Sequence, residues 1–162
     1  MQRTKGRLWY RIEPSTGMTV FGLDGPMSFD EWEEVVETAL RDPHRRPGRI
    51  LSDRRRMSGA HSVAFVERIV QYFDRRRDAL GLTRWAVLTA DQDAVYGMVR
   101  MAQVLAEPTH VEVQAFTRLG PAVAWLLDDL DAQRRTAIVQ WIEQDAAGEV
   151  PVPGAASTPS PL

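Results

Sequence analysis

The residues of this chain that could do chemistry are concentrated in and just before the segment 49–62. Six arginines occur there: Arg45, Arg46, Arg49, Arg54, Arg55 and Arg56. The same segment contains Asp53, His61 and Ser62. Guanidinium groups bind phosphates and carboxylates through paired hydrogen bonds, so this density predicts a local anion-binding site. The alternative is a solvated loop whose arginines form ion pairs within the chain. The carboxylates available for such pairs are Glu33, Glu34, Glu37 and Asp53.

A second group of candidate residues is Tyr96, Arg100 and Met101. Arg100 follows Tyr96 by four residues, which places both side chains on the same face of a helix. The guanidinium could then hold the ring or the hydroxyl at the edge of a pocket. The alternative is a structural tyrosine beside an arginine on the helix surface.

Catalytic and metal-binding motifs are missing from the sequence. There is no G-x-S-x-G turn, P-loop or G-x-G-x-x-G, and no cysteine. The histidines His44, His61 and His110 lie in separate predicted loops without the spacing of metal ligands. An acid–base pair of Asp53 with His61 is the remaining enzymatic alternative. We therefore expect no enzymatic activity, no cofactor and no metal.

Length and composition predict one globular α/β unit. The chain has 162 residues, of which 44% are hydrophobic and 26% charged, and its formal net charge is −2. These values are typical of a folded domain and give no general attraction to nucleic acid. The N-terminal residues are not followed by an apolar run long enough for a signal peptide or a membrane span. We expect a cytoplasmic protein that binds no nucleic acid and has no membrane span.

Hydrophobic periodicity predicts strands and helices in alternation. The expected strands are 7–12, 18–23, 49–53, 85–89 and 111–115. Helices are expected to begin at Ser28, at Ser62, at Asp91 or Asp93, at Leu119 and at Asp131. The first has the S-x-x-E pattern of a capping box, and the second should run to Leu80, with Gly81 after it. The order β-β-α-β-α-β-α-β-α predicts a mostly parallel five-stranded sheet.

The C-terminal part adds a further helix, 131–146, and a tail, 147–162. The tail is rich in proline, alanine and serine and is expected to be disordered, which leaves 1–146 as a single domain. Trp32, Trp85 and Trp125 are expected in the core. Trp141 lies in the extra helix, which either packs back on the domain or buries its apolar stripe against a second copy in a homodimer.

Three stretches of the sequence carry a resemblance to a known family. They are Arg49-Ile50-Leu51-Ser52-Asp53-Arg54-Arg55, Tyr96-Gly97-Met98-Val99-Arg100-Met101, and Val111 to Phe116 with the following Ala122-Val123-Ala124-Trp125-Leu126. With the element order, they resemble the SpoIIAA-like family of small bacterial proteins, which have a STAS-like domain. The resemblance covers residues 7–127. It implies a regulatory or interaction module that binds a partner protein or a small apolar ligand. The arginines near a helix start and beside apolar strands suggest the alternative, a carrier or sensor of a small apolar or anionic, lipid-like ligand.

The resemblance also makes Ser62 a candidate phosphoacceptor. In phosphorylatable STAS domains an Asp-Ser pair stands at the start of the corresponding helix, and here it is His61-Ser62. A phosphate on Ser62 would lie at a helix N-terminus near the arginines 54–56, where free N–H groups favour negative charge. The alternative is an ordinary N-cap serine, which stabilises a helix by about 1 kcal/mol.

Overall fold

The structure is a computed structural model, and it describes residues 8–57, 61–90 and 93–145. The strands are β1 (Leu8–Ile12), β2 (Thr19–Leu23), β3 (Arg49–Asp53), β4 (Thr83–Leu88) and β5 (Val111–Phe116). The helices are α1 (Phe29–Leu40), α2 (Val63–Arg75), α3 (Arg77–Leu80), α4 (Asp93–Ala106), α5 (Leu119–Leu126) and α6 (Ala132–Asp145). The expected strands, and the helices after Ser28, Ser62, Arg118 and Asp131, are confirmed. Two expectations stay predictions because residues 91–92 and 146–162 lie outside the described ranges. They are the cap of α4 by Asp91 or Asp93 and the disorder of the tail 147–162.

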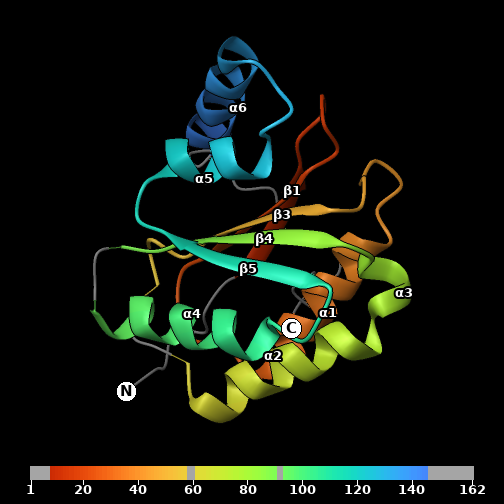
Figure 1. The fold of residues 1–162 in the computed structure, drawn as a ribbon, viewed down its shortest axis with the longest axis vertical. Coiled ribbons are helices and arrows are strands. Elements are labelled where there is room, and N and C mark those ends of the chain that lie inside the picture. The colour runs from red at the N-terminus through yellow and green to blue at the C-terminus, as the bar shows by residue number, and fades with distance from the viewer. Residues whose placement is uncertain (1–7, 58–60, 91–92, 146–162) are drawn as a thin grey trace, which may run out of the picture.

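The five strands form one sheet in the order β1-β2-β3-β4-β5. β1 is antiparallel to β2 because the turn between them is short, whereas the later strands are joined through helices and are parallel. Helices α1, α2 and α4 cover one face of the sheet, and α5 and α6 cover the other (Figure 1). The sheet is therefore the middle of three layers, and the predicted mostly parallel five-stranded α/β fold is confirmed.

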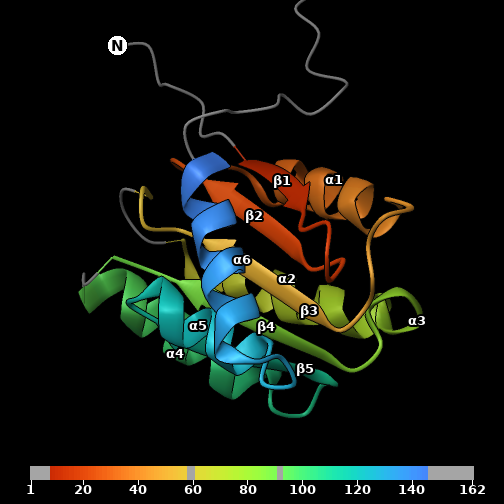
Figure 2. The same cartoon turned by 90° about the horizontal axis from the view of Figure 1, so that it is seen from above.

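Each face of the sheet has its own hydrophobic core. The core under α1, α2 and α4 is aromatic and contains Phe21, Trp32, Phe73 and Trp85. The core under α5 and α6 is aliphatic, and it includes Ile138 and Ile142 of α6. The C-terminal helix thus packs back on the sheet, next to α5 (Figure 2). In the same layer Arg11 lies 4.4 Å over the Trp141 ring.

The helix expected to run from Ser62 to Leu80 is broken at Arg76. Its backbone, at φ −107° and ψ 28°, departs from helical geometry and separates α2 from α3. The guanidinium of Arg76 donates two hydrogen bonds to the Glu37 carboxylate, at 2.7 and 3.2 Å. This contact between distant residues has no local sequence signal, and it accompanies the break. No helix in the described part of the chain is long and apolar enough to cross a membrane.

Candidate functional site

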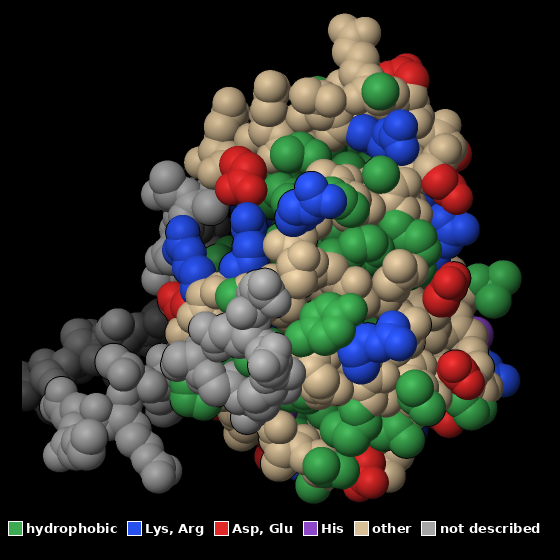
Figure 3. Space-filling view, turned by 60° about the vertical axis from the view of Figure 1, so that its left-hand side comes forward, with side chains coloured by type: hydrophobic (Ala, Val, Ile, Leu, Met, Phe, Trp, Pro, Cys, Tyr) green, Lys and Arg blue, Asp and Glu red, His purple; other side chains and the backbone are tan. Residues whose placement is uncertain are grey.

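The candidate site lies where the parallel strands end. Asp53 of β3 is paired in register with Leu88 of β4, which is paired with Phe116 of β5, so the segments that follow these strands begin side by side. Ligands of parallel α/β sheets commonly bind at this edge. Figure 3 brings the edge forward and shows basic and hydrophobic side chains next to one another on it.

The alternation of side chains along β3 determines where its arginines go. Ser52 faces the aromatic core, where its hydroxyl accepts a hydrogen bond of 2.8 Å from the Trp85 indole. Two residues later, Arg54 lies on the same side as Ser52. Its backbone is fixed there, because its N–H donates to the Leu88 carbonyl at 2.8 Å and its carbonyl accepts from the Met57 N–H at 3.0 Å.

Arg54 is a buried cation. Its side chain lies in the protein interior and the residue is 8% exposed. Its Nε has no hydrogen-bond partner among the described residues, and its Nη1 lies 4.0 Å from the Met57 sulfur. No ion pair joins Arg54 to a carboxylate of the described residues, and loss of hydration lowers the pKa of its guanidinium to about 10. A buried guanidinium with so few partners among the described residues is the strongest indication of an anion-binding site in this structure.

Arg54 borders a small apolar cavity between the sheet and helices α2 and α4. The cavity has a volume of about 40 Å³. Its walls are Trp32, Val66, Ile69, Phe73, Trp85, Val87, Met98, Val99, Ala102 and Val113, and its polar lining comes from Arg54 and His61. A cationic group at the boundary of an otherwise apolar cavity suits a ligand with one acidic and one apolar end.

His61 is the second polar group of this cavity. Its ring stacks on Phe65 with centroids 3.8 Å apart, and its Nε2 is buried without a hydrogen-bond partner among the described residues. Burial, together with the positive charge of Arg54, lowers the pKa of His61 to about 3. The imidazole is therefore neutral at physiological pH and can donate or accept one hydrogen bond at Nε2.

Thr89, directly after β4, is a buried polar residue that the sequence analysis did not single out. It is completely buried, and its Oγ1 has no partner among the described residues. Its N–H donates to the Phe116 carbonyl at 2.8 Å, which continues the β4–β5 ladder by one residue. Alternation then places the Thr89 side chain on the face of Trp85 and Val87, beyond the residues that line the cavity. The available signal in the sequence was a threonine directly after the apolar run of β4, two positions after Val87.

Asp53 and Arg55 do not join Arg54 in this cavity. They lie on the opposite face, where the Arg55 guanidinium donates to both Asp53 oxygens at 3.0 and 2.8 Å and to the Glu143 carboxylate of α6 at 3.2 Å. The hydrogen bonds and charges of these carboxylates raise the pKa of Arg55. For this arginine the interpretation as an intrachain ion pair holds, and the Asp53 carboxylate is engaged by Arg55 rather than by His61.

The other residues considered from the sequence lie on the surface. Arg56 is exposed and forms no hydrogen bond or ion pair within the described ranges. Ser62 is exposed, and its hydroxyl accepts from the Phe65 N–H at 3.1 Å, so it is an N-cap; its role as a phosphoacceptor stays a prediction. Tyr96 and Arg100 lie on the outer face of α4, and the Arg100 guanidinium donates to Gln103 at 2.9 Å.

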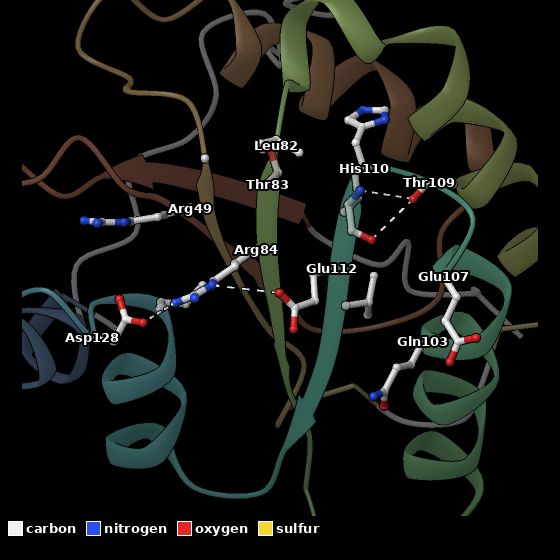
Figure 4. Close-up of a pocket in the computed structure, with 14 residues that line it drawn as sticks. Arg49, Leu82, Thr83, Arg84, Gln103, Glu107, Thr109, His110, Glu112 and Asp128 are labelled. Atoms are coloured by element: carbon white, nitrogen blue, oxygen red, sulfur yellow. Dashed lines mark hydrogen bonds and ion pairs between the residues drawn. The ribbon is translucent and has the colours of Figure 1, made fainter.

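A larger groove lies at the opposite, amino-terminal end of the strands, beside the edge strand β5 (Figure 4). It has a volume of about 700 Å³, but its cations are already neutralised. Arg84 pairs with Asp128 at 2.8 Å, and Arg49 pairs with Asp129 at 2.7 Å. The His110 ring points away from Glu112 in this view. The groove is open and internally compensated in charge, so it is a weaker candidate than the Arg54 cavity.

Comparison with solved structures shows a SpoIIAA-like fold. The chain is similar to an uncharacterised protein from the DUF3478 family, with a SpoIIAA-like fold, from Shewanella loihica PV-4. The two share 18% sequence identity, with a TM-score of 0.54, over 78% of this chain and 98% of the other. This similarity confirms the fold expected from the sequence motifs. No protein-family model and no curated protein matches the chain.

Proposed function

We propose that this protein is a non-enzymatic binding module whose ligand is a small organic anion with an apolar part. The observation that carries the proposal is Arg54, a buried guanidinium without a carboxylate partner among the described residues, at the boundary of an apolar cavity. An isolated buried charge is costly, and a bound anion would offset that cost. The buried atom His61 Nε2, which has no partner among the described residues, offers a further hydrogen bond in the same cavity.

The site supports binding better than catalysis. His61 is neutral and has no carboxylate partner among the described residues to orient it, and Asp53 is held by Arg55 on the other face of the sheet. A general base requires a proton acceptor with a pKa near the working pH and a partner that fixes its orientation. The arrangement provides neither, so we propose that the ligand is held and released unchanged.

A second candidate function is a regulatory module that binds a partner protein. It is favoured by apolar side chains on the solvent face of α4, where Val104 is 60% exposed and Tyr96 is 39% exposed. The opposite face of the same helix lines the cavity through Met98, Val99 and Ala102. A ligand in the cavity and a protein on the surface would therefore contact the same helix.

Native mass spectrometry of protein purified gently from its own host tests the ligand proposal. We expect a non-covalent small molecule that is released on denaturation and that is absent from Arg54→Met. The matched control is Arg56→Met, because Arg56 is two residues away, exposed and outside the cavity. The control should retain the ligand.

Two outcomes would contradict the proposal. Wild-type protein that carries no small molecule, and gains none from a host metabolite extract, would remove it. Equal occupancy in wild type and Arg54→Met would show that the ligand binds elsewhere. A bound protein without any small molecule would favour the partner-binding function instead.

A further inference from the structure

We propose that the ligand of the Arg54 cavity is a monocarboxylate with a short apolar tail, of about four carbons in all. This inference rests on the proposed function and specifies it. Three features of the cavity carry it: the number of its charges, the chemistry of its walls and its size.

The charge of the site matches a single negative charge. Arg54 is the only cationic side chain in the described lining of the cavity, and His61 is uncharged. A carboxylate would leave the site neutral, whereas a phosphate monoester carries a charge of roughly −1.5 to −2 near neutral pH and would leave an uncompensated buried charge. The planar guanidinium also presents parallel N–H donors at the spacing of the two carboxylate oxygens.

The arrangement of the remaining polar atoms agrees with a small, planar head group. His61 lines the cavity, and its Nε2 is buried without a hydrogen-bond partner among the described residues. As the Nε2–H tautomer, His61 can donate one hydrogen bond to a carboxylate oxygen. A carboxylate has acceptor sites for this donor in addition to the guanidinium. The two groups thus provide donors without adding a second charge.

The size of the cavity limits the tail. On the same measure of volume, one water molecule needs roughly 10–15 Å³, so about 40 Å³ accommodates roughly three groups of this size. The walls are aromatic and aliphatic side chains of the sheet, α2 and α4, and protein interiors are close-packed. A tail of about three carbons fits without moving these walls. A long acyl chain would have to separate α2 and α4 from the sheet.

Isothermal titration calorimetry with a defined series of compounds tests the inference. The carboxylates are acetate, butyrate, hexanoate and decanoate, and the comparison compounds are butyramide and propyl phosphate. Affinity should rise about fourfold for each methylene group up to butyrate, as expected for burial of a methylene. It should then level off or fall for hexanoate and decanoate. Butyramide and propyl phosphate should bind at least tenfold more weakly than butyrate. Butyramide has no negative charge for Arg54, and propyl phosphate has more negative charge than one guanidinium neutralises.

Two variants connect these affinities to the cavity. Arg54→Met should remove butyrate binding, and Arg56→Met should leave it within twofold of wild type. Ala102→Val narrows the cavity from α4 and should move the optimum to a shorter carboxylate. A circular dichroism spectrum and an unfolding curve for each variant show that it is folded.

The titrations and native mass spectrometry together distinguish failure of the short-carboxylate inference from failure of the proposed anion-binding function. If propyl phosphate binds more tightly than butyrate and depends on Arg54, the monocarboxylate inference is overturned and the proposed function stands. If affinity keeps rising through decanoate, the short tail is overturned. If no compound of the series binds, and native protein carries no small molecule, both fail.

Discussion

Replacing Arg54 by methionine should stabilise the ligand-free protein, although it removes a buried side chain of the native structure. Burial shifts the pKa of the guanidinium from 12.5 to about 10. Each pKa unit corresponds to about 1.4 kcal/mol, so the shift represents an unfavourable free energy of about 3 kcal/mol in the folded state. Methionine keeps most of the apolar stem and has no charge. Even replacement of a whole buried ion pair by well-packed hydrophobic residues is often neutral or stabilising by about 1–4 kcal/mol.

The expected gain for Arg54→Met is therefore about 1–3 kcal/mol in the free energy of unfolding. For a chain of this size this corresponds to an increase in Tm of roughly 3–10 °C. The assay is urea unfolding followed by tryptophan fluorescence, with protein refolded from denaturant so that any ligand is removed. Arg56→Met is the control, and it should change stability by no more than about 0.5 kcal/mol because Arg56 is exposed.

A loss of stability in Arg54→Met would refute this reasoning. A decrease of more than about 1 kcal/mol would mean that the guanidinium has an anionic partner within the chain. With saturating ligand the order should reverse, since only wild type gains stability from binding.

Three further predictions concern local features of the fold. Burial and the charge of Arg54 depress the pKa of His61 to about 3 from 6.5, so the unfolded chain binds a proton that the folded chain resists. The stability contributed by neutral His61 is therefore complete above about pH 6.5 and falls as the pH decreases toward 3. In His61→Phe the free energy of unfolding, measured by urea unfolding, should depend less on pH between about pH 6.5 and 5 than in wild type. Ser28→Ala removes one half of a capping box, in which Ser28 Oγ accepts from the Glu31 N–H at 3.2 Å and the Ser28 N–H donates to Glu31 at 2.8 Å; a loss of about 1 kcal/mol is expected in the same assay, and an unchanged midpoint would contradict it. In Gly22→Ala the new methyl would overlap the Trp9 ring, so a loss of about 1–3 kcal/mol and a changed tryptophan emission are expected; wild-type stability would show that the indole moves without cost.

The sequence predicted the fold well because each element carries its own local signal. The capping box at Ser28, the apolar run at Trp85 and the alternation at Val111 are complete within a few residues. The break at Arg76 was not predicted, because it coincides with a contact to Glu37, 39 residues away in the chain. Local patterns contain no information on such a contact.

The candidate site was predicted in part. Three consecutive arginines, Arg54 to Arg56, look equivalent as a sequence, yet the structure gives them a buried, an ion-paired and a solvent-exposed environment. The alternation along β3 indicates that Arg54 lies on the same face as Ser52, the face covered by α1, α2 and α4. It does not indicate that the Arg54 side chain is buried. Thr89 was missed for a related reason: an unpartnered hydroxyl is recognisable only when its surroundings are known.

The geometry of α4 connects the two candidate functions. The inner face of this helix closes the cavity through Met98 and Val99, while its outer face exposes Tyr96 and Val104. A carrier needs only the inner face, because release of a ligand requires no protein partner. Exposed apolar side chains on the outer face have no use in that role, whereas a sensor needs an element that contacts both ligand and partner. A ligand that alters the packing of Met98 and Val99 would act on the surface of the same helix. If the cavity binds a small carboxylate as proposed, the arrangement of α4 favours a sensor over a simple carrier.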